Sequence, residues 1–593
     1  MNNAKIGEMF YKISKLLEID GENMFRVRAY YKASEILSVY PVDLEKIYKE
    51  KGMKGLREIS GVGERIALKI EEYVKTGKIS QLEELERKFP EGLIDLPTHH
   101  QRVRGLPTHH QRVRGLLSVS GMGPKKVKQF FEKLKIKSME ELEQAAKEHK
   151  LCKLPGMGKK SEEKILKGIE FLKKWKGKVT LGVALPLANL IINKLKKIKE
   201  IDKIEVAGSV RRGKETIKDI DILITSNFST KIMDRFTELN VVSEVLAKGE
   251  TKSSILTKDG IQVDLRVIKP ECFGAALNYF TGSKEHNIHL RELAIKKGLK
   301  VNEYGVTREN EVMARDTEEH IYKVLGLQYI PPEIREDRGE IELAAKNQIP
   351  KLVEESDIKG DLHIHTKASD GTDDLEDIIL KCQKKGYKYI GITEHSQSLK
   401  VARGLDKKSL LVQIKTIRKL NEKLKDFYVL SGSEVDIKSD GSLDYNDDVL
   451  NELDFVIGSI HTNFNMKKDE MTKRVIKAIR TKKMHIFGHP SGRLLGEREG
   501  YEIDLDEIIK AAKDYGVALE LNAYPKRLDL IDVYCKVAKE KNVLVCLNTD
   551  AHSKENLNWM SFGVITARRG WLEKKDVLNC KELKDLLNFL KKG

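Results

Sequence analysis

The sequence predicts a multidomain α/β protein with a helical N-terminal part, a central sheet and a C-terminal barrel of alternating strands and helices. Three observations indicate this organisation. Glycine-bounded turns recur between helical patterns before residue 178, apolar strands interrupted by aspartate lie within residues 204–267, and short apolar runs alternate with helical patterns after residue 358. With 593 residues, the chain is long enough for several such domains.

The chain is basic, and its charge is unevenly distributed. It has 108 Lys and Arg against 91 Asp and Glu, a net charge of +17, and residues 101–180 alone contain 21 basic and 8 acidic residues. A segment of this kind is expected to bind a phosphate backbone with an affinity that falls as salt rises. A solvated charged face is the alternative that net charge alone leaves open.

Cysteines and apolar runs indicate the compartment. The six cysteines show no CxxC spacing, which is typical of a reduced environment. The N-terminus has no apolar signal core, and the longest apolar run, near residues 182–192, is too short to span a bilayer. We therefore expect a cytoplasmic, nucleoid-associated monomer with no membrane partner.

Three turns of one kind occur in the helical N-terminal part. Each has the pattern apolar-x-Gly-apolar-Gly: ISGVG at 59–63, VSGMG at 119–123 and LPGMG at 154–158. The glycines permit a tight turn, so that backbone amides at the start of the next helix can face a phosphate. Such a site binds DNA without reading its bases. The turns resemble helix-hairpin-helix motifs, and the glycines expected to approach DNA are Gly61, Gly63, Gly121, Gly123, Gly156 and Gly158.

The decapeptide LPTHHQRVRG is repeated in tandem at residues 96–115, just before the second turn. Adjacent histidines point in different directions, and the repeat contains no Cys, Asp or Glu, which argues against a metal site. Without these twenty residues, an apolar helix would lead directly into the second turn, whereas the repeat places Pro97 and Pro107 there. We expect an inserted, exposed and mobile basic loop.

Residues 204–225, IEVAGSVRRGKETIKDIDILIT, combine a strand, a glycine-bounded basic turn and a buried strand. The two-residue period places Asp219 and Asp221 on one face, where the carboxylates repel one another unless divalent cations lie between them. Asp264 interrupts a later apolar strand and supplies a third carboxylate. Ser209 and Arg212, on the basic turn, are placed to hold triphosphate oxygens. This spacing predicts a nucleotidyltransferase site.

These motifs resemble DNA polymerase family X, the polymerase beta group. GSVRRG with the aspartate pair resembles the palm motif of that family, and residues 279–283 resemble its YFTGS nucleotide-pocket motif. The resemblance implies three catalytic carboxylates that hold two Mg²⁺ ions: Asp219, Asp221 and Asp264.

The same resemblance assigns substrate contacts. It implies that the incoming dNTP is bound by Ser209, Arg212, Tyr279, Phe280, Gly282 and Asn287, and that Arg291 supports the template. Gln262 departs from the arginine that vertebrate members usually carry beside the third aspartate, and this departure bears on the support and ionisation of Asp264.

Lys69 is a candidate for a further activity. In polymerase beta, the helix after the first hairpin presents a lysine that attacks an abasic sugar, and GVGERIALKI places Lys69 at that position. A Schiff-base lysine needs a depressed pKa or a neighbouring cation, and Arg65 replaces a lysine of the family pattern. A lyase nucleophile and a solvated helix residue that touches DNA both remain open for Lys69.

Histidines and carboxylates follow short apolar runs throughout residues 358–593. His363 and His365 share one face of a strand, and further ligand types follow at later strand ends, as expected of a metal-bearing barrel mouth. The predicted ligands are His363, His365, Asp370, His395, Glu434, His461, His489, Asp550 and His552. This spacing resembles the polymerase and histidinol phosphatase (PHP) domain, a (β/α)7-type barrel. The resemblance implies up to three Mn²⁺ or Zn²⁺ ions, with Asp361 orienting a ligand.

The predicted organisation follows the order of these motifs. It comprises an N-terminal helical DNA-binding domain at 1–92, a fingers-like hairpin region at 93–178 that contains the insertion, a palm at 179–268, a thumb-like dNTP-selection domain at 269–330, a linker at 331–357 and a PHP domain at 358–593.

Together these features predict a DNA-directed DNA polymerase that fills short gaps in gapped or primed DNA in base excision repair. The PHP domain would add a 3′–5′ exonuclease, an abasic-site endonuclease or another 3′-end-processing activity. Two alternatives remain open: a small-molecule PHP phosphatase, and a DNA-binding scaffold with an inert palm. A tRNA-type nucleotidyltransferase shares the paired aspartates but is expected to lack the hairpins.

Overall fold

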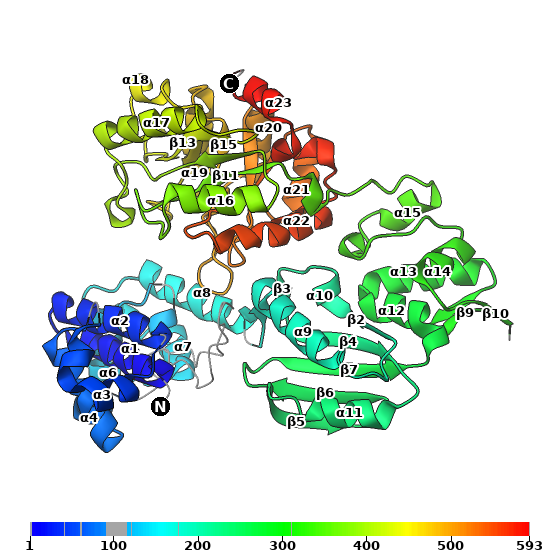
Figure 1. Cartoon of the computed structure of the whole chain (residues 1–593), viewed down its shortest axis with the longest axis horizontal. Helices are drawn as coiled ribbons and strands as arrows, with labels where there is room; N and C mark the ends of the chain where they lie inside the picture. Colours follow the sequence, from blue (N-terminus) through cyan, green and yellow to red (C-terminus); the bar gives the residue numbers. More distant parts are fainter. Residues whose placement is uncertain are drawn as a thin grey trace. The chain divides into compact units, whose positions relative to one another are not determined.

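The computed structural model describes residues 3–40, 42–59, 62–89, 116–119, 121–175, 177–309 and 311–591. These residues form two compact units, one up to Gly177 together with Thr257–Gly260, and one from Lys178 to Leu256 and from Ile261 onward. Figure 1 shows the elements of both in chain order. The tandem repeat at 96–115 and Gly61 lie outside the described residues.

Short helices make up most of the first unit (Figure 1, blue to cyan). They are α1 (Asn3–Asp20), α2 (Met24–Val39), α3 (Leu44–Arg57), α4 (Glu64–Thr76), α5 (Ser80–Lys88), η2 (Leu116–Ser118), α6 (Pro124–Leu134), α7 (Met139–Lys147), η3 (Leu151–Lys153) and α8 (Lys159–Trp175). Local signals set their ends. Asp43 accepts the Glu45 N–H at 2.8 Å, Ser138 accepts the Glu141 N–H at 3.2 Å, and left-handed Gly77 ends α4. One apolar cluster joins helices from both ends of the unit.

A five-stranded sheet forms the centre of the predicted palm. In spatial order its strands are β2 (Lys203–Val206), β4 (Asp219–Thr225), β7 (Gln262–Ile268), β6 (Lys252–Thr257) and β5 (Val242–Lys248). Accompanying elements are α9 (Leu181–Leu195), α10 (Gly208–Arg211), α11 (Ser229–Thr237), and the pair β1 (Val179–Thr180) and β3 (Thr216–Ile217). Because Ile220 and Ile222 are fully buried, the alternation along β4 leaves its aspartates on the other face.

A small helical domain with a three-stranded sheet follows the palm. It contains η4 (Pro270–Cys272), α12 (Phe273–Thr281), α13 (Lys284–Lys296), β8 (Lys300–Asn302), β9 (Gly305–Arg308), β10 (Glu311–Ala314) and α14 (Glu318–Val324). The segment predicted as a linker holds η5 (Pro332–Ile334), α15 (Glu340–Ala345) and η6 (Glu355–Asp357). Arg335 in this segment is fully buried and contacts the Glu318 carboxylate at 2.5 Å, so this part of the segment packs into the domain core.

Seven parallel strands in sequence order form the C-terminal domain, as the predicted (β/α)7-type barrel requires. They are β11 (Gly360–Ile364), β12 (Tyr389–Ile392), β13 (Tyr428–Asp436), β14 (Phe455–Ser459), β15 (Ile486–Phe487), β16 (Ala518–Asn522) and β17 (Val545–Asn548). The Leu362 N–H donates to Asn548 Oδ1 at 3.1 Å, so the first and last strands nearly close the barrel.

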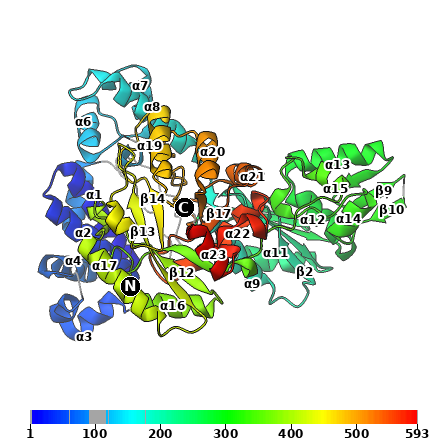
Figure 2. The same cartoon turned by 90° about the horizontal axis from the view of Figure 1, so that it is seen from above.

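Helices cover the outside of this barrel. They are η7 (Lys400–Ala402), α16 (Leu375–Lys384), α17 (Lys407–Asn421), α18 (Asp447–Leu450), α19 (Lys468–Arg480), α20 (Leu505–Tyr515), α21 (Asp532–Glu540), η8 (Asn556–Trp559), α22 (Met560–Arg569), η9 (Lys574–Asp576), η10 (Leu578–Cys580) and α23 (Leu583–Leu590). Figure 2 shows β12, β13 and β14 side by side with α16 and α17 beside them. Among the described residues, no helix is both long and apolar enough to cross a membrane.

Candidate active sites

The three palm carboxylates lie together on two neighbouring strands. Asp221 on β4 is directly opposite Asp264 on β7, and Asp219 lies two residues earlier on the same face of β4. Burial, together with the negative charges of Asp219 and Asp264, raises the pKa of Asp221 to about 6. The negative charges of the three carboxylates repel one another, and a divalent cation between them would relieve this repulsion. This set of donors therefore fits metal binding.

Asp264 is supported by two donors. Gln262 Nε2 donates to Asp264 Oδ1 at 2.8 Å, and Lys252 Nζ lies 2.9 Å from Oδ2. Burial acts to raise the pKa of Asp264, but these two donors and Ser254 hold it below its usual value. The glutamine that departs from the family pattern therefore hydrogen-bonds to the carboxylate beside it.

The basic turn places its backbone against the carboxylates. Gly208 has φ +60°, and a Cβ built on it would lie 2.3 Å from Asp221 Oδ2, so only glycine fits here. Half-buried Ser209 follows it in the short helix α10. Arg212, directly after α10, donates from Nε to Glu336 Oε1 at 3.1 Å and from Nη1 to the Thr281 carbonyl.

The predicted nucleotide-pocket residues surround the end of α12. Tyr279 and Phe280 form an edge-to-face pair with ring centroids 5.2 Å apart, and Asn287 Nδ2 donates to the Tyr279 carbonyl at 2.7 Å. Gly282, with φ +69°, ends the helix, and a Cβ there would lie 3.1 Å from Arg212 Nη1. The structure thus brings the YFTGS segment and the basic turn together.

Arg291 lies one helical turn after Asn287 on α13. It is exposed on α13, and its Nε donates to the Asn287 carbonyl at 3.2 Å. Its exposure leaves the guanidinium accessible to a nucleic-acid strand, which is compatible with the predicted template contact.

The described hairpin glycines divide into two kinds. Gly121 and Gly156 have φ +88° and +77°, in the left-handed region that favours glycine. Gly63 and Gly123 precede the first residues of α4 and α6, and nothing lies within 4 Å of a Cβ built at either one or at Gly158. Packing therefore leaves these helix starts open, as close approach of a phosphate requires.

Lys69 is half-buried on α4. Burial lowers the pKa of its ammonium, and nearby Arg26 lowers it further, while Glu72 acts in the opposite direction. A lowered pKa raises the fraction of neutral amine, which is the form that attacks a carbonyl carbon.

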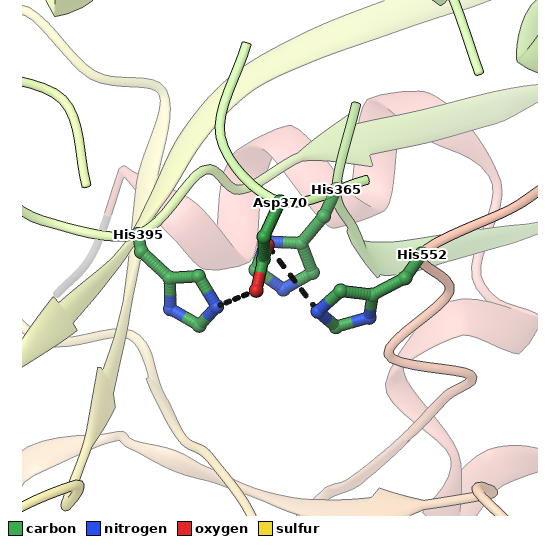
Figure 3. A group of neighbouring side chains, drawn as sticks. All are labelled: His365, Asp370, His395 and His552. Atoms are coloured by element: carbon green, nitrogen blue, oxygen red, sulfur yellow. Dashed lines mark ion pairs between the residues drawn. The ribbon is translucent and has the colours of Figure 1, made fainter. Parts of the chain in front are cut away.

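The nine histidines and carboxylates predicted for the barrel converge at the C-terminal ends of its strands. Figure 3 shows His365, Asp370, His395 and His552 pointing toward one another, with ion pairs from Asp370 to His395 and to His552. Three groups have ligand atoms within 4.8 Å of one another: His365, Asp370, His395 and His552; His363, His365 and Asp550; and His395, Glu434 and His461.

Glu434 and Asp550 link these groups. Glu434 Oε2 lies 2.8 Å from His395 Nδ1 and 3.4 Å from His363 Nε2, and its Oε1 lies 2.9 Å from His489 Nε2. Asp550 Oδ1 lies 3.2 Å from His365 Nε2. All nine predicted ligands are therefore in one continuous cluster.

Unsatisfied buried atoms show that the cluster fits metal ions. Seven buried atoms of the cluster have no hydrogen-bond partner among the described residues: His363 Nε2, both ring nitrogens of His365, His395 Nδ1, Glu434 Oε2, His489 Nδ1 and Asp550 Oδ1. Buried polar atoms without partners are costly, and metal coordination satisfies them. Burial acts to raise the pKa of Glu434, yet the surrounding histidines hold this pKa well below its usual value. The carboxylate is therefore ionised and able to bind a cation.

Two carboxylates outside the predicted ligand set hold ligand rings. Asp436 Oδ1 lies 3.1 Å from His461 Nδ1, and Glu520 Oε1 lies 2.7 Å from His363 Nδ1. Asp361 instead accepts the N–H groups of His363 and Thr549, at 3.2 Å each. Sequence reasoning missed Asp436 and Glu520, although Glu520 interrupts an apolar strand just as Asp264 does.

Five stretches of the chain match known domain families. Residues 1–79 match a helix-hairpin-helix domain, 113–170 a SAM-like helix-hairpin-helix tandem, 184–271 the DNA polymerase beta palm, 276–336 the DNA polymerase beta thumb and 361–524 the PHP domain. A palm and thumb of the polymerase beta type, joined in one chain to a PHP barrel, define a class of enzymes with two separate phosphotransfer centres.

Comparison with individual proteins narrows this class. The DNA polymerase/3′-5′ exonuclease PolX of Bacillus subtilis is 39% identical over 597 residues that cover all of both chains. A probable phosphatase of Caldicellulosiruptor bescii is 32% identical over 33% of this chain and 80% of its own length. DNA polymerase lambda of Arabidopsis thaliana is 24% identical over 56% of this chain and 62% of its own length. The chain therefore belongs to DNA polymerase family X, among the members that carry a C-terminal PHP domain.

Proposed function

We propose that this protein is a DNA-directed DNA polymerase that fills short gaps in repair and that its PHP domain is a metal-dependent 3′–5′ exonuclease. Similarity to the Bacillus subtilis DNA polymerase/3′-5′ exonuclease over the whole chain supports both activities. The observation that carries the proposal is the presence, in one chain, of a complete palm carboxylate triad and a nine-residue histidine and carboxylate cluster. Base excision repair is the pathway we propose for it.

In the palm, Asp219, Asp221 and Asp264 would hold two Mg²⁺ ions, since carboxylate oxygens are the ligands that Mg²⁺ prefers. Such ions neutralise charge on the attacking and leaving oxygens of phosphoryl transfer. Gln262 and Lys252 keep the Asp264 carboxylate ionised and oriented.

The pocket beside the triad would receive the incoming nucleotide. Ser209 and Arg212 face the triphosphate in this proposal, and Arg212 already lies beside Gly282. Because Asn287 fixes the Tyr279 carbonyl at the end of α12, the YFTGS backbone is held as one wall of the pocket. A rigid wall orients the sugar for in-line attack by the primer 3′ oxygen on the α-phosphate.

In the PHP domain, the imidazole-rich cluster would hold up to three Mn²⁺ or Zn²⁺ ions, because imidazole suits such ions better than Mg²⁺. Ions of this kind lower the pKa of water and polarise a phosphoryl oxygen. The chain's own contribution is a preformed set of donors at the barrel mouth, six of them buried.

The first test uses end-labelled DNA with a one-nucleotide gap. One reaction contains Mg²⁺ and dNTPs, and the other contains Mn²⁺ without dNTPs. We expect extension to be lost in Asp221→Asn only and shortening of the primer to be lost in His365→Ala only. Asp234→Asn, at a half-buried carboxylate of α11 that pairs with Lys248, and His485→Gln, at the opposite end of β15 from the cluster, are the matched controls.

Two outcomes contradict the proposal. Absence of extension by the unaltered chain leaves the palm as a binding platform. Release of phosphate from small esters without shortening of DNA would favour the small-molecule phosphatase, whose similarity covers 33% of this chain only.

We further propose that the hairpins bind the phosphate backbone and that Lys69 is a lyase nucleophile. The lowered pKa of Lys69 supports the second assignment. Borohydride reduction of a reaction with 5′-abasic DNA should trap a covalent adduct in the unaltered chain and not in Lys69→Ala. Lys75→Ala, on the same helix but exposed and paired with Glu71, should trap it normally. Equal trapping by both variants would exclude Lys69.

A further inference from the structure

β16 is the one strand of the barrel for which the sequence predicts no metal ligand, yet it carries a fully buried carboxylate, Glu520. Leu519 and Leu521 belong to the apolar core, so the alternation along the strand directs Glu520 to the opposite face. On that face it lies beside the metal-ligand cluster. Burying a carboxylate costs free energy unless hydrogen-bond donors satisfy its oxygens.

Four donors meet the two oxygens of Glu520. His363 Nδ1 and Asn548 Nδ2 lie 2.7 and 2.9 Å from Oε1. The His489 backbone N–H and Asn522 Nδ2 lie 2.7 and 3.3 Å from Oε2. The carboxylate therefore holds two predicted ligands from two other strands, one by its ring and the other by its main chain.

The contact with His363 sets which ring nitrogen is available to a metal. Glu520 accepts hydrogen bonds from the His489 main chain and from two side-chain amides, so its contact with His363 assigns the donor role to Nδ1. The other nitrogen, Nε2, then presents its lone pair to the cluster, where it lies 3.5 Å from Asp550 Oδ1 and has no hydrogen-bond partner among the described residues. One orientation and one tautomer of the ring are thereby selected.

The contact with His489 acts on the backbone. His489 has φ +27°, a conformation that non-glycine residues rarely adopt and that neighbouring contacts must sustain. The 2.7 Å hydrogen bond from its N–H to Glu520 supplies one such contact, and the ring then reaches Glu434 Oε1 at 2.9 Å.

We propose that Glu520 is a positioning residue of the PHP centre that fixes His363 as an Nε2 ligand and His489 in place. The inference rests on the proposed metal-dependent function of this domain. It assigns Glu520 to the ion held by the group His363, His365 and Asp550, and not to the group shown in Figure 3. Outer carboxylates of this kind change metal affinity by about 10- to 100-fold when they are altered.

Glu520→Gln is the sharpest substitution, because it keeps the size of the side chain. Whichever way the amide turns, its NH₂ group meets two of the four donors. We expect the metal content of the purified full-length chain, measured by mass spectrometry after loading with Mn²⁺ and gel filtration, to fall by one ion. Titration with Mn²⁺ should show a loss of affinity of about 10- to 100-fold, and a high Mn²⁺ concentration should restore DNA shortening.

Asp529→Asn is the matched control. Asp529 is also fully buried, and it accepts the N–H groups of Ser491 and Gly492 just after His489, but it is not in contact with a ligand ring in the described structure. We expect this variant to retain its full metal content. Equal losses in the two variants, or unchanged metal binding in Glu520→Gln, would overturn the positioning role.

Folding and function are separated by two further readouts. Gap filling by each variant reports whether the rest of the molecule is intact. If Glu520→Gln does not fold, Glu520→Asp replaces it, because aspartate keeps the charge but has a shorter side chain. Weakened metal binding in Glu520→Asp supports the inference, and unaltered binding overturns it. If Glu520→Gln weakens metal binding but the unaltered chain leaves DNA intact, the positioning role stands and the proposed nuclease fails.

Discussion

Replacing Gly208 by alanine should slow polymerisation while leaving the PHP centre unaffected. The structure gives two separate costs. At φ +60°, a non-glycine residue costs about 1–2 kcal/mol of stability. The added Cβ would also lie 2.3 Å from Asp221 Oδ2. Carbon atoms ordinarily approach other heavy atoms no closer than about 3.5 Å, so the carboxylate must move by about 1 Å.

A displacement of this size at the reacting centre is expected to lower the rate about 100-fold, which corresponds to about 2.7 kcal/mol of activation free energy. The assay is single-turnover incorporation of one nucleotide into gapped DNA, with the thermal midpoint measured in parallel. The matched control is Gly298→Ala, because Gly298 has φ +67° and nothing within 4 Å of its Cβ position. Both variants should lose similar stability, but only Gly208→Ala should lose rate. Equal rates in the two variants would refute the steric argument.

Three further predictions follow from other contacts. Gln262→Leu removes a hydrogen bond to a charged carboxylate, which is worth about 1.5–3 kcal/mol, so the rate of single-turnover incorporation should fall about 10- to 100-fold. Gln262→Arg keeps a donor and should incorporate at close to the normal rate. A normal rate in Gln262→Leu would contradict this role. Burial acts to raise the pKa of Glu318, but Arg335 and Arg211 outweigh burial and lower this pKa to about 2. The resulting stability, about 3 kcal/mol, is present above the unfolded pKa of about 4.5 and is lost as pH falls toward 2. In denaturant titrations, Glu318→Gln should therefore be less stable at pH 7 and lose less stability toward acid; an unchanged acid slope would count against it. Excision of residues 96–115 should leave both activities intact and change DNA affinity only modestly in binding titrations, and a large loss of either activity would sink the loop interpretation.

Much of the fold, the palm carboxylates and the histidine-rich cluster of the barrel could be predicted, because residues close together in the sequence form recognisable patterns. The fold class is confirmed, and the two-residue period correctly predicted that Asp219 and Asp221 share a face and that a third carboxylate, Asp264, pairs with them. Contacts between residues distant in sequence left no such pattern. Glu520 meets His363 across 157 positions, and Arg335 is buried inside a charged stretch that reads as a linker.

The two centres place acidic side chains on parallel strands but surround them differently. In the palm, an amide, an ammonium group and a hydroxyl support Asp264, and the predicted metal ligands are three carboxylates. In the barrel, the carboxylates of Glu434 and Asp550 lie among six imidazoles. Hard oxygen donors favour Mg²⁺, whereas imidazole favours Mn²⁺, Zn²⁺ and other transition metals. Because the ligand types differ, we propose that the two centres prefer different ions, so that synthesis and trimming of a DNA end would not compete for the same metal.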